Sequence, residues 1–582
     1  MLQSPPPSSI DIHLLPGRHV GPLQLLPHHA HPDTTVTFTG STSSSSPSTI
    51  SGGQPIPQFV LHDEANKVYV SDFASDDTLP RRVRHLFVND ERVFRTKVPT
   101  MEHLGETNFT LTADIMAYEV MSKVPLSWKQ PQSVEFVYSG VSSDWSEGRS
   151  GVLSVEDIPN SPNSRINMQQ PGFWNLVNKK FQPMKDSPPA SIENVGLSQL
   201  TPNTFWHDED NRKLYYKPPS ELDISSTQVE AIVAANDIIA ELKGVQNYEY
   251  KNVHFEHSTW FPDRGYAEAQ TGAFFDCEYG VVNEYLCGKD DTYSLAPAGV
   301  IISDSRDVTF TNCTFSKIGG SGLSISDGSK NVAVRGSTFT DISAAGIVLG
   351  EVNDVFDKNV ENWNENLMIE DNVLINFPVE YKGESQLFAG YVENATINHN
   401  LFQNATYSAI TIGWGWGREA SLRGNNKVNA NKIVDILSDR CCDGGAIYTI
   451  GPQVGSEIKN NYILQNSTAA YPAGGNALYH DRGSGGFQDI NNVIDGNWTH
   501  WFGTNDSSGP YGPGASCPNL DGEGGEHDCD IVIAKNYVHT AAGHDNPANN
   551  STRIFDNDIM VIDGSPFVGD AKAIVDAAGP RV

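Results

Sequence analysis

The sequence is short of basic residues and of long apolar runs. Against 71 Asp and Glu there are only 39 Lys and Arg, a net charge of −32, which argues against nucleic acids and anionic membranes as partners. No run of about 18 apolar residues occurs, so we expect no membrane-spanning segment. The start, MLQSPPPSSI, lacks the basic and apolar parts of a signal peptide. We expect that a signal has been removed or that the amino end is truncated.

Cysteine is also scarce, with seven in 582 residues. The spacings do not resemble a zinc site. They predict two local loop disulfides, as in proteins of an oxidising compartment. One more cysteine, in the segment TNCTF, is expected to be a buried strand or corner residue. The two loop pairs are Cys277 with Cys287 and Cys517 with Cys529. Cys441 and Cys442 are adjacent, and the cysteine of TNCTF is Cys313.

Glycosylation sequons are abundant. Their number predicts a secreted eukaryotic glycoprotein. The acceptor residues are Asn108, Asn312, Asn394, Asn404, Asn466, Asn497, Asn505, Asn549 and Asn550.

The chain is too long for one globular core, because such cores stop growing near ~250–300 residues. An elongated solenoid escapes that limit, since each repeat contacts only its neighbours. Short alternating strands between Gly and Pro turns predict the first solenoid coils over residues 1–56. Residues 57–225 break this rhythm and predict an inserted β-rich module of sandwich type, with its aromatics in the core. The solenoid pattern returns over residues 226–582, the main domain.

An Asn returns before a short apolar strand at intervals of 20 to 45 residues, without helical periodicity. This spacing predicts an all-β fold, a parallel β-helix with loops of unequal length. Asn side chains stacked in register can hydrogen-bond along the stack, so we expect these residues to be structural. They are Asn372, Asn400, Asn431, Asn461, Asn492, Asn536 and Asn557.

Two aspartates stand out beside glycine-rich corners. Asp443, in CCDGGAIYT, and Asp481, in YHDRGSGG, are one coil apart by the pattern. Coils stack about 4.8 Å apart, so two such carboxylates can reach the separations that glycosidases use. An Asp beside Gly can also form a simple Asx-turn. We nevertheless expect Asp443 and Asp481 to be the catalytic pair, with no metal or cofactor.

Aromatic and polar neighbours suggest a sugar site around this pair. Trp414 and Trp416 alternate with Gly in IGWGWG, and Trp rings stack on the C–H faces of sugars; one of them could instead cap the core. Tyr448, His480 and Arg482 are predicted to contact substrate or to tune a carboxyl pKa. Arg482 would keep its neighbouring Asp ionised as base or nucleophile, which leaves the other Asp as the acid.

A second acidic cluster precedes these residues. Glu380 and Glu384, in PVEYKGESQLF, are predicted to bind substrate or to supply an alternative acid. His254 and His257 alternate around Glu256 in VHFEHSTW, so the three cannot all face one side. We expect a core or corner role for the two histidines and not metal binding.

The segments IGWGWGR, DGGAIYTIGPQ and LYHDRGSGG resemble those of a known group, as do ISGGQPI, RHLFVNDERVFR, RKLYYKPP and VHFEHSTW. The chain resembles right-handed parallel β-helix proteins of glycoside hydrolase family 141 over nearly its whole length. The resemblance implies a secreted hydrolase of plant or algal glycans, with xylanase or α-L-fucosidase activity. The many sequons suggest a fungal or other eukaryotic member, and we expect a monomer. It also implies two catalytic aspartates on neighbouring coils, which fall on Asp443 and Asp481.

The chain departs from that family in three ways. The family's usual first strand and capping helix are missing, two cysteines precede Asp443, and sequons are many. Two other functions remain open on the same fold. A polysaccharide lyase would need a basic residue such as Arg418 or Arg482, together with calcium and a polyuronate substrate. The negative net charge of the chain disfavours binding of a polyuronate. A non-catalytic glycan binder would need no paired carboxylates.

Overall fold

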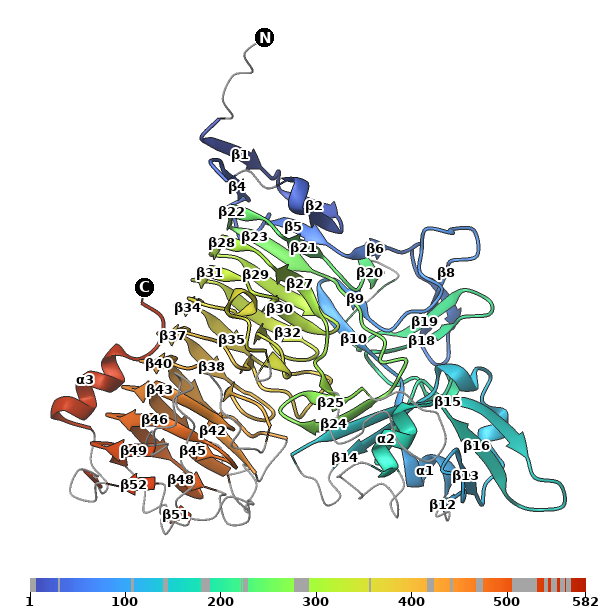
Figure 1. Ribbon diagram of the computed structural model, residues 1–582. Helices are drawn as coiled ribbons and strands as arrows, with labels where there is room; N and C mark the ends of the chain where they lie inside the picture. The colour runs from blue at the N-terminus through green and yellow to red at the C-terminus, as the bar shows by residue number, and fades with distance from the viewer. Residues whose placement is uncertain are drawn as a thin grey trace. The chain divides into compact units, whose positions relative to one another are not determined.

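The computed structural model divides the chain into two compact units, drawn in Figure 1. Unit 1 comprises residues 1–51, 238–256 and 295–582, and unit 2 comprises residues 52–237 and 257–294. Within residues 7–581 the structure describes everything except 30–31, 106–108, 140–144, 179–188, 221, 223, 225–228, 277–292, 355–356, 416–422, 440–442, 467–474, 505–530, 539–542, 546–551, 555–559 and 562–566.

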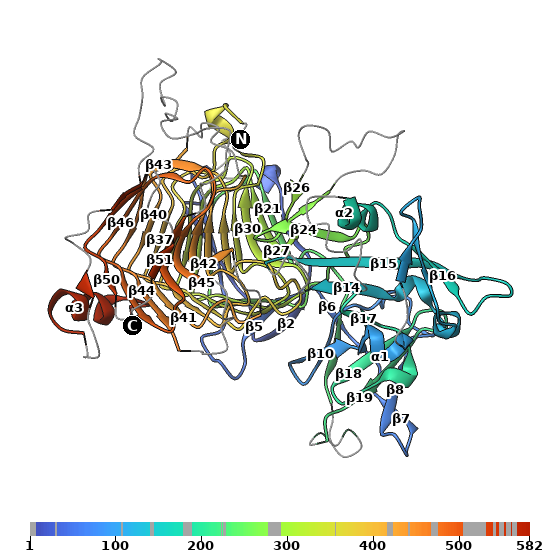
Figure 2. The same cartoon turned by 90° about the horizontal axis from the view of Figure 1, so that it is seen from below.

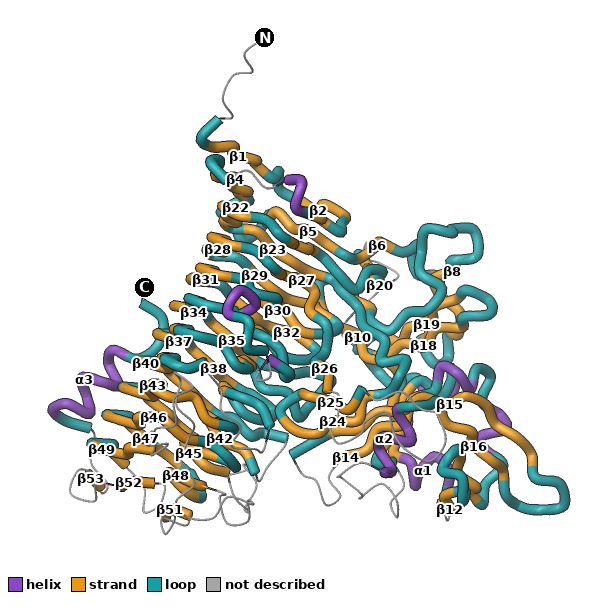
Figure 3. Tube along the Cα trace, in the orientation of Figure 1, coloured by secondary structure: helices purple, strands orange, loops and turns teal. Residues whose placement is uncertain are grey.

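Unit 1 is a parallel β-helix, which confirms the predicted fold class. The coils contribute one strand each to three parallel sheets, A, B and C, in that order along the chain; the last coil has described strands in A and B only. Strands dominate the trace in Figure 3. In Figure 2 the strands of sheet C, such as β42 and β45, are seen apart from those of sheet B, such as β41 and β44. Three corners therefore recur on every coil: A to B, B to C, and C to A.

Within each of the three sheets, the strands follow one another in space in chain order. Sheet A contains β1 (Ser9–His13), β4 (Thr35–Thr39), β22 (Gln246–Lys251), β28 (Arg306–Thr311), β31 (Lys330–Arg335), β34 (Met368–Glu370), β37 (Thr396–Asn398), β40 (Lys427–Asn429), β43 (Pro452–Lys459), β46 (Gly485–Ile490), β49 (Ile531–Ala534) and β52 (Thr552–Ile554). Sheet B contains β2 (Gly17–Val20), β5 (Ser48–Ser51), β23 (Val253–Glu256), β29 (Thr314–Ile318), β32 (Thr338–Ile342), β35 (Val373–Ile375), β38 (Leu401–Gln403), β41 (Lys432–Val434), β44 (Tyr462–Gln465), β47 (Val493–Gly496), β50 (Tyr537–Val538) and β53 (Met560–Val561). Sheet C contains β3 (Leu23–Leu25), β21 (Ala240–Lys243), β27 (Ala298–Ser303), β30 (Ser321–Ser326), β33 (Ile347–Leu349), β36 (Leu387–Ala389), β39 (Ile410–Ile412), β42 (Gly444–Thr449), β45 (Gly475–His480), β48 (His500–Thr504) and β51 (Gly543–Asp545).

The interior of unit 1 is built from columns of like side chains, because successive coils pair in register and alternate residues point inward. Phe38, Tyr250 and Phe310 form one stack in sheet A, with ring centroids 4.9 and 5.0 Å apart. On sheet C, Ile410, Ile447 and Leu478 form an inward column. The next residues along the three strands are Thr411, Tyr448 and Tyr479. By the same alternation, these three lie on the outer face of the sheet.

A buried asparagine ladder follows the corner between sheets A and B. The side chain of Asn431 accepts from the backbone N–H and the Nδ2 of Asn400, both at 3.0 Å. Its own Nδ2 donates to Asn461 Oδ1 at 3.0 Å and to the Ile397 carbonyl at 2.9 Å. The same pattern links the six described asparagines from Asn372 to Asn536. The predicted structural role is therefore confirmed for these six, while Asn557 lies outside the described residues.

Cys313 occupies the same corner at an earlier coil. It is buried as a free thiol, and its backbone N–H donates to Ser337 Oγ at 3.1 Å. Ser337 is joined in turn to Asn372 Oδ1 through its own N–H at 2.9 Å. The predicted corner role of Cys313 is thus confirmed. The other six cysteines lie outside the described residues, so the two loop disulfides stay predictions.

The carboxyl end of the chain covers part of sheet B. Helix α3 (Gly569–Ala577) packs against Tyr462, Val493 and Tyr537. Beyond the helix, the Gly579 N–H donates to the Ala430 carbonyl at 2.9 Å. No helix in the part of the chain that the structure describes is long and apolar enough to cross a membrane.

Unit 2 contains two largely antiparallel sheets and the short helices α1 (Thr100–Leu104) and α2 (Gly172–Asn178). The first sheet contains β6 (Gly53–Pro55), β20 (Ala231–Ala234), β9 (Leu86–Val88), β10 (Glu91–Arg95), β18 (Thr204–Asp208), β19 (Lys213–Lys217), β8 (Val68–Asp72) and β7 (Val60–Asp63). The second contains β11 (Lys97–Pro99), β17 (Ser191–Glu193), β14 (Glu135–Ser139), β15 (Glu147–Asp157), β16 (Ser164–Met168), β13 (Ala117–Val120), β12 (Phe109–Leu111), β24 (Tyr266–Gln270), β25 (Ala273–Phe275) and β26 (Tyr293–Ser294).

The predicted boundaries of the insertion differ from those of unit 2. The predicted module ends at residue 225, whereas unit 2 continues to residue 237 and takes in residues 257–294 as a second segment. Strand β20 was expected in the solenoid, yet it pairs with β6 and β9. Because β20 and the solenoid strands are all short apolar runs, the local pattern does not distinguish their partners.

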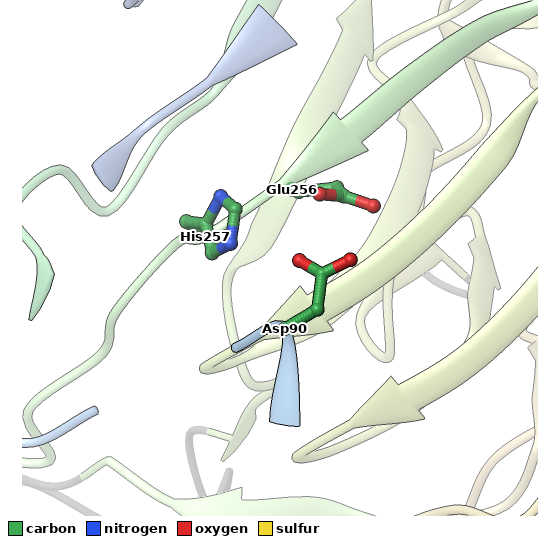
Figure 4. A group of neighbouring side chains, drawn as sticks. All are labelled: Asp90, Glu256 and His257. Carbon is green, nitrogen blue, oxygen red and sulfur yellow. The ribbon is translucent and has the colours of Figure 1, made fainter. Parts of the chain in front are cut away.

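His257 has the core role that the sequence predicts. Figure 4 draws its side chain and labels it. The His257 ring is buried and packs edge-on against Phe87, with ring centroids 5.1 Å apart.

We expect Asn431→Ala to lower the free energy of unfolding by about 3 kcal/mol or more. The substitution removes four hydrogen bonds inside the ladder, and each buried group left unsatisfied costs ~1–3 kcal/mol. Chemical denaturation of the full chain measures the loss. Lys427→Ala, an exposed truncation on the same coil, is the control and should change stability by less than about 0.5 kcal/mol. Equal effects of the two variants would contradict a stabilising role of the ladder.

Candidate active site

The two predicted catalytic aspartates lie at opposite ends of two neighbouring strands of sheet C. Asp443 directly precedes β42 at the B-to-C corner, and Asp481 directly follows β45 at the C-to-A corner. The two strands pair in parallel, with Tyr448 opposite Tyr479. The structure thus places both carboxylates on adjacent coils, as the spacing predicts.

Two tyrosines from the outer face of these strands hold the aspartates in a crossed arrangement. Tyr448 of β42 donates its hydroxyl to Asp481 Oδ2 at 2.5 Å. Tyr479 of β45 donates to Asp443 Oδ1 at 2.6 Å. The rings meet edge to face with centroids 5.4 Å apart. Each carboxylate is therefore oriented by a strand that belongs to the other coil.

The two glycines after Asp443 make room for this arrangement. A Cβ atom on Gly444 would lie 2.7 Å from the ring of Tyr407, and one on Gly445 would lie 2.8 Å from Tyr479 Cβ. Tyr407 stands one coil earlier, and its hydroxyl donates to the Asp443 carbonyl. The sequence analysis did not identify Tyr407 or Tyr479 as site residues. Their place beside the DGG segment becomes evident only when coils are aligned in register.

Asp481 is the more deeply buried of the pair. It is 3% exposed, and its Oδ1 is buried without a hydrogen-bond partner among the described residues. Burial, followed by the nearby charge of Asp443, raises its pKa to about 7, although the hydrogen bond from Tyr448 and the charge of Arg482 act in the opposite direction. The charge of the half-buried Arg482 thus acts in the predicted direction, but desolvation of Asp481 outweighs it.

His480 does not occupy the predicted substrate-binding position. It lies in the inward column of β45, opposite Thr449, and is 2% exposed. Its Nδ1 is hydrogen-bonded to Thr449 Oγ1 and its Nε2 to the buried Asp489 Oδ2, both at 2.6 Å. Both ring nitrogens are thus used inside the β-helix. The prediction failed because the neighbour of an outward residue on a strand points inward.

Tyr448 is likewise completely buried, so in this structure it serves Asp481 and not an exposed sugar surface. Burial, and next the charge of Asp481, raise the pKa of its phenol well above the usual value, which keeps it a neutral donor. Trp414 follows β39 and is buried. Its carbonyl accepts from Tyr391 Oη at 2.6 Å. Trp416 and Arg418 lie outside the described residues.

Glu380 and Glu384 occupy the B-to-C corner two coils before Asp443, between β35 and β36. Glu380 is half-buried and Glu384 is buried. The adjacent Ser385 shares a 2.7 Å hydrogen bond with Thr411, and Thr411 pairs with Tyr448. This corner therefore reaches the outer face of sheet C beside the tyrosines.

Comparison with known proteins supports the fold. The family model of the right-handed beta helix region matches residues 222–362 and 291–443. A solved structure described as a glycoside hydrolase aligns over 91% of this chain and 89% of its own, with a TM-score of 0.73 and 21% identity. A structure of XylC with xylose aligns over 96% and 81%, with a TM-score of 0.40 and 11% identity. No curated protein matches the chain. The chain is thus similar to right-handed parallel β-helix proteins in fold.

The raised pKa of Asp481 predicts a pH-dependent effect of Asp481→Asn on stability. The carboxyl of Asp481 has a pKa near 7 in the folded state and near ~3.9 in the unfolded state. As the pH rises between these two values, only the unfolded state ionises, so the wild type becomes progressively less stable. We expect the variant to be more stable than the wild type by up to about 4 kcal/mol above pH 7. The difference should vanish near pH 4.

Denaturation of both proteins between pH 4 and pH 8 measures this difference. The exposed Asp439 supplies a control, Asp439→Asn, that should follow the wild type at every pH. A constant difference between Asp481→Asn and the wild type across this range would contradict the raised pKa.

Proposed function

We propose that this protein is a secreted glycoside hydrolase of plant or algal cell-wall glycans, in which Asp481 is the acid and Asp443 the base or nucleophile. One observation carries the proposal: two carboxylates lie on adjacent coils, and burial together with the charge of Asp443 raises the pKa of the more deeply buried Asp481 to about 7. Glycosidases use such a pair, with one carboxyl protonated and the other ionised. The similarity in fold to a structure described as a glycoside hydrolase agrees with this function.

The chemistry follows from the hydrogen bonds of the pair. Asp481 Oδ2 accepts from Tyr448, which leaves Oδ1 as the oxygen that would carry the proton of the acid and pass it to the glycosidic oxygen as the bond breaks. Asp443, held by Tyr479 and less buried, would attack the sugar carbon or activate a water molecule. Tyr448 and Tyr479 act as positioning residues, because neutral phenols orient the carboxylates without exchanging protons.

The remaining features belong to the same proposal. The substrate would be a xylose- or fucose-bearing oligo- or polysaccharide, bound without cofactor by a monomer. The proposal includes secretion, glycosylation and the two loop disulfides, which would suit a protein that acts on cell walls. Several of the acceptor asparagines, among them Asn404 and Asn466, lie in the described part of the chain, and both of these are exposed.

We expect Asp443→Asn and Asp481→Asn each to lower kcat by more than about a hundredfold, because each removes a group that bonds to the reacting atoms. Release of reducing sugar from xylan and from fucosylated, arabinose- and galactose-bearing glycans measures the loss, with Asp439→Asn as the control. Chelator should have no effect.

Other outcomes would point to other functions. Calcium-dependent release of an ultraviolet-absorbing unsaturated product would indicate the lyase. Binding of glycans by the wild type without turnover would indicate a non-catalytic binder. Full activity in either aspartate variant would remove that residue from the pair and direct attention to Glu380 and Glu384.

The pH dependence tests the assignment of roles. Because Asp481 must be protonated to act as the acid, kcat should fall as the pH rises through about 7. In Tyr448→Phe, loss of a hydrogen bond that lowers the pKa of Asp481 should move this fall to higher pH. A fall that moves to lower pH, or that stays in place, would contradict the assigned role of Tyr448.

A further inference from the structure

One inward column of sheet C changes from apolar to polar at the coils that carry the two aspartates. The column is apolar on every strand from β21 to β39 and polar on β42, β45 and β48. Asp443 directly precedes β42 and Asp481 directly follows β45, so the change coincides with the candidate active site. In chain order the members of the column are Leu242, Ile302, Ile325, Leu349, Ala389, Ile412, Thr449, His480 and Thr504.

A carboxylate of sheet A meets this column inside the β-helix. Asp489 of β46 is completely buried, and its Oδ2 lies 2.6 Å from His480 Nε2. Asp489 belongs to an inward column that is otherwise apolar from β28 to β49. The apolar members are Phe310, Val334, Ile369, Ile397, Val428, Ile458 and Ile533.

Stability alone does not explain why Asp489 and His480 occupy these positions. The His480 ring contacts those of Phe487 and Phe502, with centroids 5.5 and 5.6 Å apart, so its surroundings are partly aromatic. Taking a carboxylate and an imidazole out of water costs free energy, and apolar residues of similar volume often serve stability equally well or better. We therefore looked for what else the pair does.

Hydrogen bonds continue from this pair to the turn that carries Asp481. An ionised carboxylate only accepts, so the His480 proton lies on Nε2, and Nδ1 accepts from Thr449 Oγ1 at 2.6 Å. Thr449 Oγ1 accepts in turn from the Ser484 hydroxyl at 2.9 Å. The Thr449 carbonyl accepts from the Asp481 N–H at 2.9 Å, and the Ser484 N–H donates to the Asp481 carbonyl at 3.0 Å. Both ends of the turn 481–484 are thus attached to Thr449.

We propose that Asp489, His480 and Thr449 are positioning residues that fix the backbone of Asp481 and so aim its Oδ1 at the glycosidic oxygen. This role rests on the glycosidase function proposed above. Tyr448 and Thr449 are consecutive on β42 and lie on opposite faces of the strand. The first holds the Asp481 carboxylate and the second holds its backbone. A misplacement of ~1 Å at a reacting group can cost ~10²-fold in rate, so this anchorage acts directly on catalysis.

The test removes the anchorage without emptying the interior. Thr449→Val deletes the hydroxyl at constant shape, and Thr449→Ser retains the hydroxyl. The double variant His480→Phe/Asp489→Leu makes both columns apolar at these positions. Ile458→Val, a truncation beside Asp489 in the same column, is the control for a small loss of packing. For each full-length variant, kcat and KM are measured on the glycan that the wild type cleaves fastest, and denaturation reports folding.

We expect Thr449→Val and the double variant to lower kcat at least about tenfold with little change in KM, because the anchorage acts in the transition state. The double variant should be at least as stable as Thr449→Val, since no buried polar group of the pair remains. Thr449→Ser and Ile458→Val should keep a kcat close to that of the wild type. Wild-type kcat in Thr449→Val would overturn the proposal, as would an equal loss in Thr449→Ser.

A second readout does not depend on turnover. Asp481 interacts with the charges of Asp443 and Arg482 and with the phenols of Tyr448 and Tyr479, and Thr449→Val leaves all four in place. Release of the turn should admit water to Asp481 and lower its pKa. The stability that Asp481→Asn gains above pH 7 should therefore shrink in the Thr449→Val background and persist in the Thr449→Ser background.

The two readouts separate this proposal from the proposed function. An undiminished gain in the Thr449→Val background would contradict the positioning of Asp481. A wild type that cleaves no glycan, yet shows the diminished gain in Thr449→Val, would contradict the glycosidase function and leave the anchorage of Asp481 standing.

Discussion

The asparagine ladder at the A-to-B corner holds the coils of unit 1 in register. Each Asn bonds to the next coil through both its amide and its backbone, so a coil cannot slip against its neighbour without orphaning buried polar groups. In a strand, a slip of one residue exchanges the two faces. The register that the ladder maintains therefore keeps Tyr448 and Tyr479 outward and His480 inward, although the ladder lies at a different corner from both aspartates.

The arrangement of the two aspartates requires that register. Asp443 and Asp481 stand at opposite ends of paired strands, and the long phenol side chains span the distance between them. Burial then distinguishes the two carboxyls, since it raises the pKa of the desolvated Asp481 to about 7, whereas Asp443 is more accessible. Beneath them, the inward chain of Thr449, His480 and Asp489 satisfies polar groups inside the β-helix.

Several of these features could be predicted from the sequence, because they are local. The repeated Asn residues, the parallel β-helix and the pairing of Asp443 with Asp481 follow from periodicity and glycine-rich corners. The role of Arg482 could not be predicted from adjacency, because desolvation of Asp481 depends on what covers it. Tyr407 and Tyr479 were missed because their partners are 36 residues away along the chain. The second segment of unit 2 was missed for a similar reason, since β24 pairs with the distant β15.

The repeat, the fold class and the placement of Asp443 and Asp481 on neighbouring coils can thus be read from the sequence alone. These depend on side-chain types that recur at regular spacing along the chain. The unequal burial of the two aspartates, the tyrosine that holds each carboxylate and the inward position of His480 required the folded structure. Each of those outcomes depends on burial and on contacts between coils, and both arise only when segments about thirty residues apart are stacked in register.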